Sequence, residues 1–472
     1  MTSTVSADFQ GKHVTVAGLG VSGIPAAKAL HARGALVTVV NDGDDARARE
    51  QAAELEALGV TVRLGDGATL PEGTELIVTA PGWKPDKPLF TAAREAGVEI
   101  WGDVELAWRL RGPDAAPWLA ITGTNGKTTT TQMLASILKA AGLRTAAVGN
   151  IGVSLLDAVL GEEQYDVLAV ELSSYQLHWA PSLRAHSAAV LNLAPDHLDW
   201  HGSMEAYARD KGRVYEGNRV ACVYNVADKA TEDLVREADV EEGCRAIGFT
   251  LGPPGPSQLG VVDGILVDRA FVENRQKNAQ ELAEVSDVDP PAPHNIANAL
   301  AAAALARAFG VPAKAVRDGL RAFTPDAHRI AHVADVDGVA YVDDSKATNT
   351  HAAEASLAAY ESIVWIAGGL AKGASFDELV AKSAKRLRGV VLIGADRALI
   401  REALARHAPE VPVVDLDRTD TGAMLQAVTE AKRLARPGDT VLLAPACASM
   451  DMFTNYNKRG DAFAEAVREL GS

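Results

Sequence analysis

Residues 121–130 read Ile-Thr-Gly-Thr-Asn-Gly-Lys-Thr-Thr-Thr, and this stretch lies between an apolar run and a segment of helical character. The backbone N–H groups of a glycine-rich loop in this setting cradle phosphates. Lys127 would then reach the β- and γ-phosphates, and the hydroxyl of Thr128 would ligate Mg²⁺. The stretch departs from the strict GxxxxGK[ST] form, because its earlier glycine is Gly123. It predicts a nucleotide-binding loop, and the alternative is a Gly-Lys-Thr that stands at a helix start by chance.

Two polar residues follow apolar runs downstream of this loop. Glu171 comes after Val167–Val170, and His197 stands in a Pro-Asp-His turn after Ala188–Leu193. Side chains at the carboxyl ends of parallel strands face the binding crevice, and carboxylate oxygens suit Mg²⁺. We therefore interpret both residues as candidate metal ligands. The alternative is a capping or solvated glutamate and a structural histidine.

Short apolar runs rich in Val, Ile and Leu recur along the chain, and Ala-rich segments of helical character follow them. Nearly continuous apolar runs are typical of strands that are covered on both faces, which favours parallel sheets in layered α/β domains. At ~150 residues per domain, the 472 residues indicate about three domains. The runs are His13–Gly18, Leu36–Val40, Leu76–Ala80, Leu119–Gly123, Val167–Leu172, Ala188–Leu193, Val220–Asn225, Ile363–Gly368, Val390–Gly394 and Thr440–Pro445.

Soft or turn-rich segments interrupt this pattern. The soft segment 111–117, and the end of an Ala-rich helical run before Phe323, place domain boundaries near 113 and 326. Residues 252–260 are turn-rich, so we expect a surface excursion that continues neither a strand nor a helix. Residues 278–293 are acidic and end in Asp-Pro-Pro-Ala-Pro, which predicts an extended connector.

A second glycine motif, Gly-Leu-Gly-Val-Ser-Gly at residues 18–23, is a complete GxGxxG before a helical segment that starts at Ile24. Its glycines allow a tight turn and let phosphates approach the N-terminus of the helix. An NAD site also needs an acid at the end of the second strand, where Asn41 and Asp42 stand. The motif alone leaves NAD, another diphosphate-bearing nucleotide and a purely structural turn open. Nothing later in the chain supplies identifiable hydride-transfer chemistry.

Composition excludes several classes of protein. The chain has 46 Lys and Arg against 62 Asp and Glu, a formal net charge of −16, which disfavours nucleic acid as a partner. Cys222, Cys244 and Cys447 form no CxxC, so we expect neither a disulfide framework nor a thiolate metal site. The first residues lack a signal-peptide pattern, and no apolar stretch reaches ~18 residues, so we expect neither secretion nor a membrane span.

Four stretches in combination resemble the Mur ligase family, whose members are ATP-dependent amide ligases that build the peptide stem of peptidoglycan and are related to folylpolyglutamate synthetases. They are the loop at 121–130, ELSSYQL at 171–177, DHLDWHGSMEAYARDK at 196–211 and HNIANALAA at 294–302. The resemblance runs through essentially the whole chain. It implies an α/β fold of three domains: a Rossmann-like domain that binds a UDP-linked substrate (1–112), a central P-loop ATPase-type domain with a mostly parallel sheet (113–325), and a Rossmann-like domain that binds an amino acid (326–472).

Other stretches resemble the members of this family that add D-glutamate. Residues 344–349 read Asp-Ser-Lys-Ala-Thr-Asn, and residues 444–453 are similar to those members' SPACASxDxF stretch, with Ala444 in place of the leading Ser. The resemblance implies that ATP phosphorylates the terminal carboxylate of UDP-N-acetylmuramoyl-L-alanine and that the amine of D-glutamate attacks the acyl phosphate. It also implies two Mg²⁺ ions, with Mn²⁺ as an alternative. We expect a cytoplasmic monomer that binds neither nucleic acid nor membrane.

The resemblance also assigns roles to individual residues. The implied catalytic residues are Lys127, Asn150, His197 and Lys211, the last one carbamylated. The implied ATP contacts are Gly123, Thr124, Asn125, Gly126, Lys127, Thr128, Thr129, Asn295, Asn298, Arg329 and Asp344. The implied metal ligands are Thr128, Glu171, His197 and Lys211. The UDP-linked substrate would meet Gly20, Ser22, Gly23, Asn41, Asp42 and Gly82, although Asn41-Asp42 departs from the Asp-Thr-Arg of some members. D-Glutamate would meet Lys346, Thr348, Lys372, Ser449 and Tyr456, where the family usually has Phe at the last position.

Two other functions stay open at this point. Another amide ligase, which adds a diamino acid or acts on folate, would share most of these motifs. A non-enzymatic or NAD-dependent nucleotide-binding protein would share the glycine loops alone. Without the resemblance, Lys211 would be interpreted as a surface lysine on a polar helix.

Overall fold

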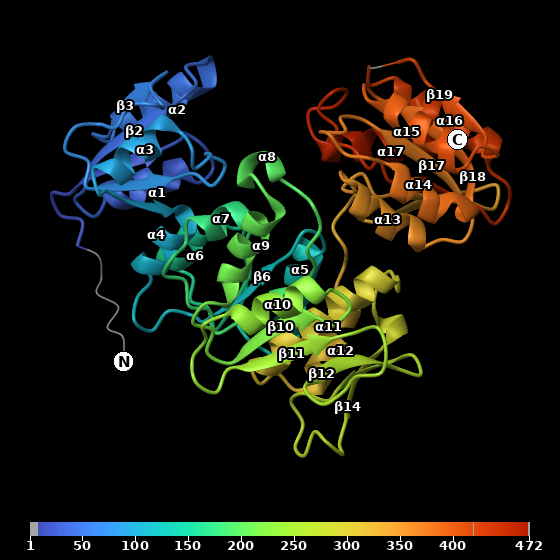
Figure 1. The fold of residues 1–472 in the computed structure, drawn as a ribbon, viewed down its shortest axis with the longest axis horizontal. Helices are drawn as coiled ribbons and strands as arrows, with labels where there is room; N and C mark the ends of the chain where they lie inside the picture. Colours follow the sequence, from blue (N-terminus) through green and yellow to red (C-terminus); the bar gives the residue numbers. More distant parts are fainter. Residues whose placement is uncertain (1–7, 419, 471–472) are drawn as a thin grey trace. The chain divides into compact units, whose positions relative to one another are not determined.

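The computed structural model describes residues 8–418 and 420–470 (Figure 1). Three β-sheets of mostly parallel strands confirm the α/β class. Residues 1–7, in the first predicted domain, and residues 471–472, in the third, lie outside the described residues. The first residues, which lack a signal-peptide pattern, fall largely within this N-terminal part. Within the described ranges, no helix combines the length and the apolar character that crossing a membrane requires.

The first sheet has five parallel strands in the order β3-β2-β1-β4-β5. The order reverses between β1 and β4, which is where doubly wound sheets bind nucleotides. The 18–23 motif leaves β1 at this point, as the sequence predicts for a Rossmann-like domain. The elements are β1 (His13–Ala17), α1 (Gly23–His31), β2 (Leu36–Asn41), α2 (Ala46–Glu56), β3 (Thr61–Leu64), β4 (Leu76–Thr79), α3 (Pro88–Glu95), β5 (Glu99–Gly102) and α4 (Asp103–Leu110).

The second sheet has nine strands in the order β14-β13-β12-β11-β10-β9-β6-β8-β7. Strand pairs from β7 to β12 are parallel, and the last two pairs are antiparallel. Its elements up to β10 are β6 (Trp118–Thr122), α5 (Lys127–Ala140), β7 (Ala147–Gly149), α6 (Leu155–Leu160), β8 (Leu168–Glu171), α7 (Ser174–His178), β9 (Ser187–Val190), α8 (Leu198–His201), α9 (Met204–Gly212), a 3₁₀ turn (Arg213–Tyr215) and β10 (Ala221–Asn225). The remaining elements are α10 (Lys229–Glu237), β11 (Arg245–Phe249), β12 (Gln258–Val262), β13 (Ile265–Asp268), β14 (Gln280–Glu284), a 3₁₀ turn (Val285–Asp287), α11 (Pro293–Ala308) and α12 (Ala313–Ala322).

Two expectations about the end of this sheet are wrong in part. The surface excursion predicted at 252–260 runs into strand β12, which starts at Gln258. The extended connector predicted at 278–293 contains strand β14, a 3₁₀ turn and the first residue of α11. β14 carries mostly polar residues and is extended because it pairs with β13, so a neighbouring strand rather than a local preference determines its conformation.

The third sheet has six strands in the order β15-β16-β20-β17-β18-β19, and only the pair β15-β16 is antiparallel among the described pairs. Strands β16, β20 and β17 are neighbours, so the loops after their carboxyl ends meet at one edge. The elements are β15 (Ala331–Val336), β16 (Val339–Asp343), α13 (Thr350–Ala358), β17 (Ile363–Gly368), α14 (Asp377–Ser383), a 3₁₀ turn (Ala384–Arg386), β18 (Leu387–Ile393), α15 (Arg397–His407), β19 (Val413–Asp415), α16 (Ala423–Leu434), β20 (Thr440–Leu443) and α17 (Tyr456–Leu470).

The chain divides into two compact units, one with the first and second sheets and one with the third. The predicted boundary near 326 lies close to Thr324, where the main segment of the second unit starts. The predicted boundary near 113 falls between α4 and β6, inside the first unit. There Trp108 and Trp118 pack with their ring centroids 5.0 Å apart, in a hydrophobic core that residues of both sheets share. The predicted bounds 1–112, 113–325 and 326–472 therefore stay predictions.

The three cysteines carry free thiols, as the sequence predicts. Cys222 and Cys447 are buried, and Cys244 is half-buried. The Sγ atoms of Cys222 and Cys244 lie 3.9 Å apart, well beyond the length of about 2.05 Å of a disulfide bond.

Candidate active site

The loop between β6 and α5 has a backbone that requires glycine at two places. Gly123 and Gly126 have φ angles of 150° and 84°. A Cβ atom on Gly126 would lie 2.4 Å from Oδ1 of Asn298, and one on Gly123 would lie 3.0 Å from Cβ of Leu191. The loop is therefore packed tightly against α11 and the end of β9, and it presents backbone rather than side chains at these turns.

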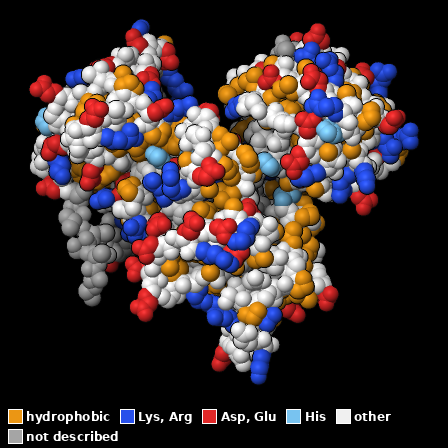
Figure 2. All heavy atoms as spheres, in the orientation of Figure 1, with side chains coloured by type: hydrophobic (Ala, Val, Ile, Leu, Met, Phe, Trp, Pro, Cys, Tyr) orange, Lys and Arg blue, Asp and Glu red, His pale blue; other side chains and the backbone are white. Residues whose placement is uncertain are grey.

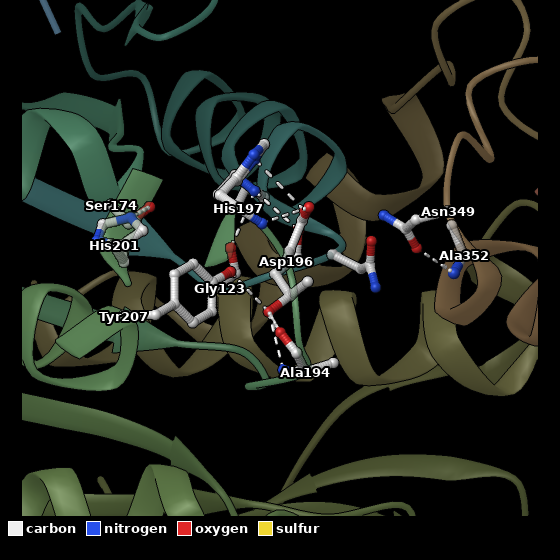
Figure 3. Close-up of polar contacts among 12 residues, drawn as sticks. Gly123, Ser174, Ala194, Asp196, His197, His201, Tyr207, Asn349 and Ala352 are labelled. Carbon is white, nitrogen blue, oxygen red and sulfur yellow. Dashed lines mark hydrogen bonds and ion pairs between the residues drawn. The ribbon is translucent and has the colours of Figure 1, made fainter. Parts of the chain in front are cut away.

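Side chains from two other segments hold the loop in place. Asn192 makes a reciprocal pair with Asn125: its Oδ1 accepts from the Asn125 N–H at 2.9 Å, and its Nδ2 donates to the Asn125 carbonyl at 3.1 Å. The hydroxyl of Thr124 lies 2.9 Å from the Tyr207 hydroxyl and 3.1 Å from the Ala194 carbonyl (Figure 3). The sequence interpretation assigned no role to Asn192 or Tyr207, because their contacts with the loop arise only in the folded chain.

Two lysine side chains converge on this loop. Lys127 Nζ donates to the carbonyl oxygens of Gly123 and Thr124, both at 2.9 Å. Lys211 Nζ, from α9, donates to the same Gly123 carbonyl at 2.8 Å and to the Thr122 hydroxyl at 3.4 Å. Two amine groups thus meet at one carbonyl oxygen of the loop, that of Gly123.

Lys211 is fully buried, which contradicts the interpretation as a surface lysine. Burial, and the nearby charge of Lys127, lower the pKa of Lys211 well below its ordinary value, against the opposing effects of Asp196 and Glu171. The neutral amine is therefore favoured at this position over the ammonium.

Glu171 and Asn150 lie together at the carboxyl end of β8. Asn150 Nδ2 donates to Oε1 of Glu171 at 2.9 Å. The other carboxylate oxygen, Oε2, is buried and has no hydrogen-bond partner among the described residues. An orphaned buried carboxylate oxygen fits a cation such as Mg²⁺, and the buried hydroxyl of Thr128 is another donor that Mg²⁺ accepts. Across residues 8–418 and 420–470, no three His, Cys, Asp or Glu side chains form a group that could hold a metal ion.

His197 stands at the start of α8 with a left-handed backbone (φ 54°). Its Nε2 lies 3.5 Å from Oδ2 of Asp196 (Figure 3). Its ring packs on Tyr175 with the centroids 4.9 Å apart. Burial, and the charges of Lys127 and Lys211, lower the pKa of His197, although Asp196 opposes the shift. A neutral imidazole, the form that binds metals, is therefore favoured.

A buried hydrogen-bond network that the sequence interpretation missed supports α9 beside Lys211. Oδ2 of Asp210 lies 2.8 Å from Nδ1 of His178 and 3.0 Å from Nδ1 of His201. Nε2 of His201 lies 3.0 Å from the Ser174 hydroxyl. The network joins α7, α8 and α9 next to Lys211, the residue of α9 that contacts the glycine loop.

The first glycine motif is already tied to a buried acid. The Ser22 hydroxyl donates to Oδ2 of Asp103 at 2.9 Å, and Nε2 of Gln176 lies 3.4 Å from the same oxygen. Burial raises the pKa of Asp103. Gly23 is required because a Cβ atom there would lie 1.9 Å from the Gly18 carbonyl.

The other residues predicted for the UDP-linked substrate surround this motif. Oδ1 of Asn41 accepts from the Leu19 N–H at 3.1 Å, so Asn41 braces the motif directly. Asp42 Oδ2 lies 2.5 Å from Nζ of Lys87. Open space adjoins the Cα atoms of two further predicted residues, Gly20 and Gly82.

The predicted nucleotide contacts outside the loop lie on α11 and after β16. Asn298 packs against Gly126, as described, whereas Asn295 Nδ2 donates to the carbonyl oxygens of Asp289 and Pro290 at 3.0 Å. Asp344 is buried, accepts from the Ser356 hydroxyl, and has a pKa that burial raises to about 6, although the charge of Arg329 acts to lower it.

The structure brings two of the residues predicted for D-glutamate together. Lys346 Nζ lies 2.8 Å from the Tyr456 hydroxyl and 4.2 Å from the centroid of its ring. The Thr348 N–H donates to the Lys346 carbonyl at 2.8 Å. Within residues 324–418 and 420–470, no hydrogen bond links this pair to Lys372 or Ser449. Lys372 has a left-handed backbone (φ 50°), and Ser449 is buried.

Arg459 is a buried residue that the sequence interpretation missed. Its guanidinium donates to the hydroxyl and the carbonyl of Ser345, at 3.0 and 2.8 Å, and to the carbonyl of Cys447 at 3.0 Å. It thereby connects the loop after β16 with the loop after β20. A lone arginine in a polar helix carries no sequence signal for such a position.

Matches to family models now account for nearly the whole of this arrangement. Residues 12–102 match the MurD-like N-terminal domain of Mur ligases, residues 121–306 the Mur ligase middle domain, and residues 328–447 the glutamate ligase domain of Mur ligases. The chain belongs to the Mur ligase family.

Relatives of this Mur ligase are found among curated proteins and solved structures. The UDP-N-acetylmuramoylalanine–D-glutamate ligase of Streptomyces coelicolor is 90% identical over 98% of this chain and 99% of that protein. The protein of the same description from Streptomyces avermitilis is 89% identical over 98% of this chain and 100% of that protein. The crystal structure of the MurF ligase from Thermotoga maritima in complex with ADP has a TM-score of 0.56 at 15% identity, covers 100% of this chain and 99% of that chain, and shows the shared fold.

Proposed function

We propose that this Mur ligase joins D-glutamate to UDP-N-acetylmuramoyl-L-alanine with the hydrolysis of ATP to ADP and phosphate, in the synthesis of peptidoglycan precursors. The observation that carries this function is the identity of 90% to the D-glutamate ligase of Streptomyces coelicolor over nearly the full length of both chains. The cluster of Lys127, Lys211 and Glu171 around the glycine loop suits the phosphoryl transfer that such a ligase performs.

The proposed reaction has two stages. The carboxylate of the L-alanyl residue attacks the γ-phosphate of ATP, which gives an acyl phosphate and ADP. The amine of D-glutamate then attacks the acyl carbon, the tetrahedral intermediate collapses with loss of phosphate, and the amine proton is released. Because a carboxylate and a triphosphate repel each other, both stages require concentrated positive charge.

Lys127 supplies part of this charge. In the structure its Nζ donates to two carbonyl oxygens of its own loop, both at 2.9 Å. We infer that phosphate oxygens replace these carbonyl acceptors when ATP binds. The backbone N–H groups of residues 123–129 would hold the remaining phosphate oxygens.

Lys211 is proposed to act as a carbamate. Its buried amine is favoured in the neutral form, which is the form that adds to CO₂: the nitrogen bonds to the carbon, and one proton is released. The product is an anion with two oxygens where the ammonium stood. This change suits a metal site, because an ammonium beside Lys127 would repel a cation.

Thr128, Glu171, His197 and carbamylated Lys211 are the residues that we propose hold Mg²⁺, in a site for two ions. When bound, Mg²⁺ neutralises phosphate charge. Asn150 orients Glu171 through the hydrogen bond of 2.9 Å to Oε1, which leaves Oε2 free to act as a ligand. The count of ions and the use of Mn²⁺ as an alternative stay predictions.

The remaining roles follow the same division of the chain. The 18–23 motif with Asn41, Asp42 and Gly82 is proposed to hold the UDP portion. Asn295, Asn298, Arg329 and Asp344 are proposed to contact the nucleotide. Lys346 and Lys372 supply charge for the two carboxylates of D-glutamate, together with the hydroxyls of Thr348, Ser449 and Tyr456. The cytoplasmic location and the monomeric state stay predictions.

An amino-acid panel tests the function directly. Phosphate release is measured with UDP-N-acetylmuramoyl-L-alanine, ATP and one of D-glutamate, L-glutamate, L-lysine or meso-diaminopimelate, with matched acceptors for the last three. We expect turnover only with D-glutamate and only when both substrates are present. Turnover confined to another amino acid would identify a different amide ligase, and tight NAD binding without turnover would identify a dinucleotide-binding protein.

A further inference from the structure

A pocket of about 630 Å³ lies in the central sheet region, lined by residues at the start of β11, between β13 and β14, and at the end of α11. It is separate from the nucleotide loop. Arg307, in the pocket, and Asn298, against the loop, are nine residues apart on α11, which corresponds to about 13 Å along the helix axis. None of the residues assigned to catalysis or substrate binding lines this pocket.

The lining of the pocket is basic. It includes Arg245, Arg275 and Arg307 with the amide side chains of Asn274 and Gln276, and no Asp or Glu is among the described residues that line it. Acidic residues outnumber basic residues in the chain, 62 to 46, and the two kinds are interspersed over the face drawn in Figure 2. A hollow with three arginines and no acid therefore departs from the rest of the molecule.

Two of the arginines form the fixed floor of the pocket. Arg307 donates to Oδ2 of Asp268 at 2.9 Å and to the Phe271 carbonyl at 3.1 Å. Arg245 donates to the Ala270 carbonyl at 2.6 Å and lies 5.1 Å from the centroid of the Phe271 ring. These contacts hold both guanidinium groups in place.

Arg275 completes the pocket from the segment between β13 and β14. Its side chain is exposed, and no hydrogen bond or ion pair reaches its guanidinium from the described residues. Burial, and the charge of Arg275, lower the pKa of Arg245. Asp268 pairs with Arg307 and also acts to raise the pKa of Arg245, so Arg275 brings a third positive charge to a site that holds one carboxylate.

We propose that this pocket binds a small phosphate-bearing dianion. The fork of a guanidinium matches two oxygens of a phosphate, and three arginines beside one carboxylate leave two positive charges to match the charge of a dianion. The volume falls within the range of about 300–1,000 Å³ that is typical of small-molecule sites. Asn274 and Gln276 offer amide donors to the oxygens that the arginines leave unpaired.

The ligand would add a contact between two parts of the chain that Arg307 already joins through the Phe271 carbonyl. Arg275 lies in the segment 269–279 between β13 and β14, and Arg307 lies in the last turn of α11. A dianion that contacts both would hold this segment against the helix. Binding should therefore slow amide hydrogen exchange in residues 271–279.

Pyrophosphate is the probe that tests the proposal on the full chain. Pyrophosphate also fits the nucleotide loop, so we expect a calorimetric titration of the wild type to show two sites. Arg275→Ala should weaken one of them by about tenfold or more, because hydrogen bonds to a charged group are lost. Lys127→Ala should remove the other. The control is Arg468→Ala, which changes an exposed arginine on α17 and should alter neither site.

The outcomes separate this inference from the proposed ligase function. The pocket is supported if pyrophosphate slows amide hydrogen exchange at 271–279 in the wild type but not in Arg275→Ala, while ligase turnover is the same in both proteins. An isotherm that Arg275→Ala leaves unchanged, or exchange at 271–279 that pyrophosphate does not slow, would overturn it. Binding of a single-stranded oligonucleotide without binding of pyrophosphate would overturn it as well, since the partner would then be a polyanion. If Lys127→Ala removes neither of the two pyrophosphate sites, that result would count against the nucleotide loop only.

Discussion

Replacement of Asp344 by Asn should stabilise the region around strand β16, and more strongly at alkaline than at acidic pH. Burial raises the pKa of Asp344 from 3.8 to about 6, so ionisation costs the folded protein ~3 kcal/mol more than the unfolded chain. The folded state binds the proton more tightly, so stability is fully present below pH 3.8 and is lost as the pH rises through 6. Asn does not ionise, and its amide can still accept from the Ile330 N–H and donate to the Ser356 hydroxyl.

The size of the effect depends on pH in a way that can be calculated. At pH 5 the cost in the wild type is about half of the ~3 kcal/mol that it reaches at pH 8. The advantage of Asp344→Asn should therefore grow between these pH values by an amount that corresponds to roughly tenfold in the population of open states. Hydrogen exchange of peptides that cover β16 measures this population, and comparison of the two proteins at one pH cancels the intrinsic pH dependence of exchange.

A matched control separates ionisation of a buried acid from a general effect of losing a carboxylate. Asp335→Asn removes an acid from the neighbouring strand β15, where the side chain is 69% exposed, and should leave exchange in β16 unchanged at both pH values. If the ratio of exchange rates between Asp344→Asn and the wild type is the same at pH 5 and pH 8, the buried acid does not carry the cost that the structure assigns to it.

Three further predictions concern the active site. Lys127→Ala should reduce ATP turnover by about 100-fold or more, because the positive charge that faces the phosphates is lost, while the circular dichroism spectrum stays that of the wild type; normal turnover would remove the nucleotide loop from the mechanism. Lys211→Ala should be inactive and should regain part of its activity in formate or acetate, which replace the carbamate oxygens; full activity without these acids would show that the modified lysine is dispensable. Tyr456→Phe should keep D-glutamate ligation, with a change in KM for D-glutamate of less than about tenfold, because the ring beside Lys346 remains and only the hydroxyl is lost; complete loss of turnover would give the hydroxyl a larger role than a contact at the pocket.

Local patterns allowed much of the fold to be predicted. The motifs at 18–23 and 121–130 lie between a strand and a helix, as expected, because a glycine loop depends on its own backbone and on the apolar run before it. The segments at 252–260 and 278–293 were interpreted less well. Residues in both segments form strands because they pair with the neighbouring strands β11 and β13. A short stretch of sequence does not show which strand will lie beside it, so these strands were not predicted.

The candidate site shows the same limit more sharply. Lys211 is polar and lies on a helix, so its complete burial beneath the Gly123 carbonyl follows from the packing of α9 and not from its neighbours in sequence. Only the family resemblance pointed to it. Asp103 was missed for a similar reason: it lies far along the chain from Ser22, and the sequence gives no sign that the two side chains meet.

Arg459 limits how the proposed amino-acid pocket of this enzyme could change in evolution or by engineering. Its guanidinium serves three acceptors on two loops at once, and burial lowers its pKa to about 10. A lysine in its place would offer a single charged nitrogen and could not span both loops with the same fork. A redesign that aims at a different amino acid is thus free to exchange residues that face the ligand, provided that it retains this one arginine, which the ligand need never touch.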